Sequence, residues 1–306
     1  MYLHAVTLNS GLESKSPLSK LTAAVKLHVR AMGAPRLTRG WLDLLNSDPC
    51  LRQLATLQPR LIHKIYRHWL SKRYCSQRRL SALADHYRFI VQQGLGEAVV
   101  EAASGGLQLA SFTGKSGANY TIELRAVVPM EREGELVLQL LCESALVYSL
   151  AFSFVQEGLT RQIGIGCVQG PQCGGGLELG REATRDLHGL RPKNLLLKLV
   201  SQLGHAWGCD HLVLVGNANR TVCVKSIRKG KVKACYDSLW QELGATSRAD
   251  GDWQLNCAAL QAPDMEQIPS KKRAEMRRRH DLLSEINNSV LARMTGVESK
   301  RYAASA

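Results

Sequence analysis

The sequence lacks the residue spacings that define the common metal and cofactor sites. It contains nine cysteines but no CxxC pair and no HxxxH pair, and only Cys167 and Cys173 are close, at a spacing that zinc sites do not use. No GKS or GKT follows its glycine run, and neither a serine-hydrolase elbow nor a dinucleotide fingerprint is present. We therefore expect no structural metal, no P-loop or Rossmann chemistry, and cysteines that are reduced and mostly buried.

Long apolar runs are missing as well. The most apolar stretch, residues 136–155, is interrupted by Gln139, Glu143 and Ser144 and is typical of two strands around a turn. Residues 1–16 show no basic segment followed by an apolar one, so we predict no signal peptide. The expectation is a cytoplasmic protein, and peripheral contact with the inner membrane stays open.

Negative charge is scarce. The chain has 40 Lys and Arg against 26 Asp and Glu, a net charge of +14, and a pI of about 9.5. Such a surplus fits nucleic acid, anionic lipid or a phosphorylated ligand, although basic proteins without a specific polyanion partner are also common. Residues 60–74 mix basic and aromatic side chains, which suits either phosphate contact with stacking or a helix with a solvated basic face. No recognition-helix signature indicates a specific nucleic-acid reader.

The apolar pattern changes its period along the chain. Helical spacing dominates up to about residue 93, where Leu18, Leu21, Val25 and Val29 predict one amphipathic helix. Alternation dominates from about residue 105 to 168, where five segments separated by short turns predict an antiparallel meander. A basic helix is predicted from residue 270 to about 294, with a solvated or polyanion-binding face.

These patterns predict an α/β (α+β) protein with an antiparallel-rich central sheet and flanking helices. We divide it into a basic helical region at 1–100, an α/β core at 101–260 and a basic C-terminal helix at 261–306.

The most polar connection between two apolar strands lies within residues 163–217. A strand is predicted to end near Val168, a glycine turn to follow at 174–176, a helix to cover about 194–207, and a second buried strand to cover 211–216. Ligands of α/β proteins bind where loops leave the sheet. The functional site is therefore predicted in this connection.

Cations cluster in the same connection, at Arg181, Arg185, Arg191 and Lys193. A guanidinium presents a planar fork that matches phosphate or carboxylate, so an anion site is one interpretation. Ion pairs with Glu178 and Glu182, each about one helical turn before an arginine, are the other. His188 is a candidate general base, because imidazole titrates near neutral pH, or else a hydrogen-bonding group within a loop.

Nearly the whole chain resembles the VirK/YbjX family of bacterial proteins. The resemblance is carried by Leu83-Ala-Asp-His86-Tyr87, Leu150-Ala-Phe-Ser-Phe154, Ile165-Gly-Cys-Val-Gln-Gly-Pro171, the block from Arg181 to Lys193, and the segment from Tyr236 to Gly244. It implies a role at the bacterial envelope, in virulence and resistance to host antimicrobial peptides, and supplies no reaction.

Residues 105–255 also resemble the GNAT-type N-acyltransferase fold. In that fold a glycine-rich turn opens a helix whose N–H groups hold the pyrophosphate of acyl-CoA. The corresponding run here is His188–Leu196, which implies donor contacts from Gly189 and Asn194 besides the four cations. Arg191 and Lys193 stand where the family has glycine, so they would bind phosphate by charge. The resemblance places Asn217 among the cofactor contacts and makes Tyr236 the proton donor to the leaving thiolate.

Two main hypotheses follow, with nucleic-acid binding as a third class. The first is an acyl-CoA- or acyl-carrier-dependent acyltransferase that modifies an envelope component. The second is a non-catalytic accessory protein that uses its basic surfaces on the inner membrane or on a protein partner.

Overall fold

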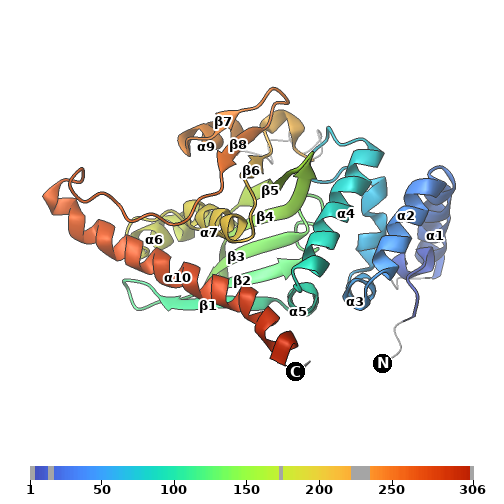
Figure 1. Ribbon diagram of the computed structural model, residues 1–306, viewed down its shortest axis with the longest axis horizontal. Helices are drawn as coiled ribbons and strands as arrows, with labels where there is room; N and C mark the ends of the chain where they lie inside the picture. Colours follow the sequence, from blue (N-terminus) through green and yellow to red (C-terminus); the bar gives the residue numbers. More distant parts are fainter. Residues whose placement is uncertain (1–3, 13–16, 172–174, 222–234, 304–306) are drawn as a thin grey trace.

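A mixed β-sheet lies at the centre of the protein (Figure 1). The computed structural model describes residues 4–12, 17–171, 175–221 and 235–303. In this part of the chain the sheet has eight strands in the order β1-β2-β3-β4-β5-β6-β8-β7. They are β1 (Leu107–Thr113), β2 (Asn119–Ala126), β3 (Leu136–Cys142), β4 (Ala145–Glu157), β5 (Thr160–Gln169), β6 (His211–Leu214), β7 (Thr246–Ser247) and β8 (Trp253–Asn256).

The first five strands form the predicted antiparallel meander, which is confirmed. Strand β2 alternates between buried and more exposed residues, as expected of a strand with one face on the core. Strands β3, β4 and β5 are buried over most of their length, because helices cover the centre of the sheet.

The chain changes direction after β5. Helices α6 (Gly176–Asp186) and α7 (Pro192–Ala206) connect β5 to β6, which runs parallel to it. Strand β8 then inserts between β6 and β7, antiparallel to both. The predicted fold class and the order of elements expected of the acyltransferase-like core are both found in the structure.

Helices surround the sheet. The remaining ones are η1 (Leu8–Gly11), α1 (Pro17–Met32), α2 (Pro35–Asn46), α3 (Pro49–Leu57), η2 (Pro59–Tyr66), α4 (Ser76–Gln92), α5 (Gly96–Ser104), η3 (Asn217–Asn219), α9 (Tyr236–Glu242) and α10 (Ser270–Ala303). Helix α4 packs on β4, α5 on β1 and β2, α7 on β3 to β6, and α10 on β1 and α7. Helices α1 to α3 lie beyond α4 at one end of the molecule (Figure 1). One apolar core runs through both the helical region and the sheet. The domain boundaries at residues 100 and 260 remain predictions.

The apolar residues that predicted the first helix do not pack as that prediction implied. Helix α1 is present, but Leu21, Val25 and Val29 are exposed, and Leu27 and Ala31 are buried instead. Helical spacing identifies an apolar face but not the surface that covers it.

A buried ion pair joins the helical region to the sheet. Lys64 of η2 donates to Glu135, just before β3, with 2.5 Å between Nζ and Oε1. The hydroxyl of Tyr87 on α4 donates to the other Glu135 carboxylate oxygen. All three side chains are buried, so the carboxylate has exchanged water for two protein donors.

Candidate functional site

Local backbone geometry sets the course of the β5–β6 connection. Gly175 precedes α6 with φ 95°, a left-handed conformation that suits glycine. His188 and Gly189, with φ 52° and 76°, turn the chain between α6 and α7. Arg279 of α10 donates from Nε to the His188 carbonyl at 2.8 Å, which fixes this turn against the C-terminal helix.

The predicted cations of this connection surround one cavity of about 660 Å³, called here the cationic cavity. Helix α6, the start of α7 and β4 form its walls, lined by Tyr148, Leu177, Glu178, Gly180, Arg181, Thr184, Arg185, Arg191, Pro192 and Lys193. All four cations predicted from the sequence are therefore brought together at the N-terminus of α7. Arg191 is the N-cap residue there and makes no side-chain cap hydrogen bond.

Two carboxylates partly neutralise the cationic cavity. Glu242, the last residue of α9, pairs with both Arg191 and Lys193, with 3.3 Å between Lys193 Nζ and Glu242 Oε2. These contacts lower the pKa of the Glu242 carboxyl, with the hydrogen bond from Lys193 the larger cause. Four cations against Glu242 and Glu178 leave a surplus of two positive charges (4 − 2).

Within the described residues Glu182 forms no ion pair with Arg185, although the helical spacing predicted one. Glu178 forms the predicted pair with Arg181 and pairs with Arg185 as well. Its carboxylate lies 3.4 Å from Arg181 Nη1 and 3.5 Å from Arg185 Nη2. All these side chains are well exposed, so each pair is screened by water and holds its partners weakly. An incoming polyanion could take the place of these carboxylates with little cost.

Tyr236, the predicted proton donor, is buried where the sheet opens. Strand β6 pairs with β5 only from Gln162 to Ile165, so Cys167 and Val168 lie beyond the parallel pairing. The Val168 N–H donates to the Tyr236 hydroxyl at 2.9 Å, and that hydroxyl lies 3.1 Å from both Cys167 Sγ and the Val168 carbonyl oxygen. The phenol thus hydrogen-bonds to the N–H and carbonyl of Val168, which a neighbouring strand would otherwise pair with.

The surroundings keep Tyr236 protonated. Burial, followed by the neighbouring Cys167 thiol, holds the pKa of Tyr236 well above its ordinary value, although the Arg220 guanidinium opposes this from 3.8 Å over the ring. Burial also raises the pKa of the Cys167 thiol to about 11. A neutral phenol and a neutral thiol therefore lie side by side at the end of β5.

Asn217 anchors this region. Its backbone N–H and its side-chain amide donate to the two oxygens of Asp237, each at 3.0 Å, and its side-chain oxygen accepts from the Tyr236 N–H at 2.8 Å. These bonds hold α9, and with it Tyr236 and Glu242, in place.

The remaining predicted residues lie near the cationic cavity without lining it. His188 is half-buried in the α6–α7 turn, and Gly189 beside it faces Arg279. Asn194 lies in the first turn of α7, and its side-chain oxygen is buried without a hydrogen-bond partner in the described part of the chain. The catalytic and donor-binding roles of all nine predicted residues stay predictions.

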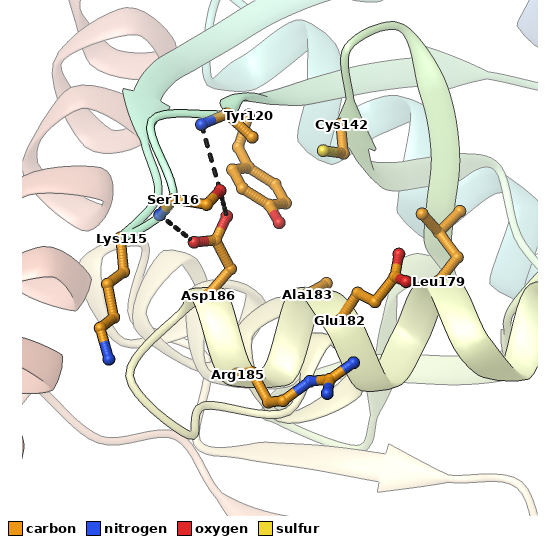
Figure 2. A pocket seen from close by; sticks show the side chains of 10 residues that line it. Lys115, Ser116, Tyr120, Cys142, Leu179, Glu182, Ala183, Arg185 and Asp186 are labelled. Atoms are coloured by element: carbon orange, nitrogen blue, oxygen red, sulfur yellow. Dashed lines mark hydrogen bonds between the residues drawn. The ribbon is translucent and has the colours of Figure 1, made fainter.

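A second cavity, of about 500 Å³, lies on the other side of α6 and was missed by the sequence prediction (Figure 2). Asp186 at the end of α6 accepts from the Ser116 N–H at 2.5 Å and from the Ser116 hydroxyl at 3.0 Å. Figure 2 shows the Tyr120 ring beside Asp186, and Cys142 lies opposite Tyr120 on the neighbouring strand β3. Burial, followed by hydrogen bonds with Cys142 and Asp186, raises the pKa of Tyr120.

The residues that line this second cavity could hardly be recognised from the sequence. Tyr120 and Cys142 were each one more residue of a strand, and Ser116 one more residue of a turn. The one available signal was the glycine at 114, because a side chain there would collide with Asp186.

Among the described residues, we find no helix with an apolar stretch long enough to span a membrane.

The chain is similar to several known proteins. The family described as "Protein of unknown function (DUF535)" matches residues 17–292. "Uncharacterized protein YbjX" of Escherichia coli K12 is 29% identical over 277 residues, which cover 89% of this chain and 83% of that protein. "Membrane protein LapB" of Mannheimia haemolytica is 27% identical over 173 residues, 56% of this chain and 72% of that protein.

Among solved structures, a mutant of the cAMP-binding acyltransferase from Mycobacterium smegmatis matches 73% of this chain and 63% of its own, with 9% identity and a TM-score of 0.29. A score this low supports no inference about activity. The family match instead covers almost the whole chain, and it agrees with the VirK/YbjX resemblance seen in the sequence. The chain therefore belongs to the DUF535 family, which includes YbjX-like proteins.

Proposed function

We propose that the protein is an acyltransferase that takes its acyl group from acyl-CoA or an acyl carrier and modifies a component of the bacterial envelope. The observation that carries the proposal is the convergence of Arg181, Arg185, Arg191 and Lys193 on one cavity at a helix N-terminus. Both donors bear phosphate groups, and unpaired helix N–H groups and guanidinium forks are the usual partners of phosphate. The name of one relative, "Membrane protein LapB" of Mannheimia haemolytica, supports the envelope as the place of action.

Tyr236 is the proposed proton donor. When the acceptor nucleophile attacks the thioester carbonyl, the carbon–sulfur bond breaks and the leaving thiolate needs a proton. The raised pKa of Tyr236 means that the phenol carries its proton at neutral pH, as a proton donor must. His188, half-buried in the turn beside the cationic cavity, is the candidate base that takes the proton from the nucleophile.

The proposal is tested by calorimetric titration with CoA, acetyl-CoA and a long-chain acyl-CoA. Saturable binding to the wild type, lost in Arg191→Ala/Lys193→Ala, supports it. Lys271→Ala/Lys272→Ala is the matched control, because it removes the same charge from exposed positions on α10. Equal loss in both double variants would show only non-specific attraction to a basic protein.

Turnover is tested separately, by mass spectrometry of CoA released from acyl-CoA in the presence of an envelope extract. Tyr236→Phe should lower the rate of release and leave the dissociation constant for the donor unchanged. A parallel loss of binding would instead assign Tyr236 to positioning.

One observation favours the non-catalytic alternative, since Glu242 already fills the position between Arg191 and Lys193. In that case the cationic cavity would be a structural joint between α7 and α9. Failure of all three CoA compounds and of an acyl-carrier donor to bind would support this accessory role.

A further inference from the structure

Helix α1 carries an apolar stripe that the described part of the chain leaves uncovered. Leu21, Val25, Val29 and Met32 are 63%, 55%, 57% and 72% exposed. Their spacing of four, four and three residues places them on one face of the helix. They are four of the eight large apolar side chains that are exposed in the described residues. Scattered apolar residues are ordinary on a surface, but an aligned stripe indicates an interaction site.

The charged residues near the stripe are all positive. By helical spacing Lys26 and Arg30 lie along one side of it, and Arg36 and Arg39 follow on α2. All four side chains are exposed, and no ion pair joins them to a carboxylate within the described residues. The sequence from residue 17 to 42 contains no Asp and no Glu.

We propose that α1 is a membrane-docking helix, which lies in the interface of a bilayer rich in anionic lipid. An apolar face with a basic border is the composition of helices that rest in the headgroup region, where the stripe enters the acyl boundary and the cations meet lipid phosphates. Figure 1 places α1 at the outer end of the helical layer, away from α6, so docking leaves the cationic cavity accessible. The proposal does not depend on acyl transfer.

A second copy of the chain is a poorer occupant. A symmetric contact through α1 would bring Lys26, Arg30, Arg36 and Arg39 of two copies together without a carboxylate to offset them. An anionic bilayer supplies the charge that the helix lacks.

The test is flotation of the full chain with vesicles of equal parts phosphatidylglycerol and phosphatidylcholine, with pure phosphatidylcholine as the neutral comparison. We expect binding to the anionic vesicles that weakens with salt. Lys26→Ala/Arg30→Ala should lower the partition coefficient about 30-fold. Val25→Ser/Val29→Ser, which leaves the charge unchanged, should lower it about tenfold.

Two control variants distinguish binding through α1 from non-specific binding through other basic or apolar surface residues. Lys271→Ala/Lys272→Ala removes the same charge from α10, and Val91→Ser/Leu159→Ser removes exposed apolar residues from other elements. Both should bind like the wild type, and circular dichroism should show all variants folded. Absence of flotation, or equal loss in the control variants, would overturn the proposal. So would gel filtration that shows a dimer which Val25→Ser/Val29→Ser converts to monomer without any vesicle binding.

Discussion

Two lysine–glutamate contacts in this protein share their chemistry and differ in their surroundings. Lys64 and Glu135 meet between the helical region and the sheet, with side chains 4% and 0% exposed. Lys193 and Glu242 meet at the mouth of the cationic cavity, with side chains 22% and 50% exposed. The first carboxylate is held by a second buried donor, Tyr87, and the second by a solvated arginine, Arg191.

The difference shows how burial decides what an ion pair does. A buried carboxylate that loses a partner stays desolvated, so the Glu135 cluster fixes the two regions to each other. A solvated carboxylate regains water when it is displaced, so Glu242 can hold the cavity in shape and still yield to a ligand.

Breaking the buried cluster should have the largest effect. Glu135→Gln leaves Lys64 without a carboxylate in a dry environment, and we expect a loss of about 3–5 kcal/mol in the free energy of unfolding. Urea denaturation measures it. Glu131→Gln is the matched control, because Glu131 pairs with Arg60 and Arg67 at the surface, and it should cost less than about 1 kcal/mol. Similar losses in the two variants would show that burial does not decide the contribution of these ion pairs to stability.

His86, next to Tyr87 on α4, gives the buried region a pH dependence. Burial, followed by the charge of Lys64, lowers its pKa from 6.5 to about 3. The unfolded chain therefore binds a proton that the native protein excludes, and stability is lost as the pH falls from about 6.5 toward 3. We expect the histidine to contribute about 2–3 kcal/mol of that loss between pH 7 and 4.5.

His86→Asn tests this, since an amide oxygen can still accept from the Phe154 N–H that the imidazole now binds. The variant should have a correspondingly flatter profile of unfolding free energy against pH. An unchanged profile would mean that native His86 takes up its proton normally.

Removing the solvated cations should barely affect stability. We expect Arg191→Ala/Lys193→Ala to unfold at the wild-type urea concentration within error, because its ion pairs are screened. A large shift in that midpoint would make the cationic cavity a structural joint, as the accessory alternative requires.

Local patterns were enough to predict much of this architecture. Period-two alternation predicted the five-strand meander, and the order of polar residues identified the connection that contains Arg181, Arg185, Arg191 and Lys193. These features depend on residues close in sequence. That these four cations line one cavity was not predicted.

Contacts between residues far apart in the sequence could not be predicted from local patterns. Glu242 lies 49 residues from Lys193, Asp186 lies 70 from Ser116, and Glu135 lies 71 from Lys64. Nothing in the spacing of any one segment pairs these positions. Helix α1 shows a different limit of the sequence pattern. The apolar spacing correctly predicted a helix, but its apolar face does not pack on the core.

The most direct test of the account is the effect of Glu242→Gln on the calorimetric dissociation constant for CoA. If Glu242 is an internal anion that a ligand displaces, the variant should bind CoA about three- to tenfold more tightly than the wild type. Glu266→Gln, at an exposed position outside the cavity, should change nothing. Weaker or unaltered binding by Glu242→Gln, with the protein still folded, would contradict the assignment of this cavity as an anion site.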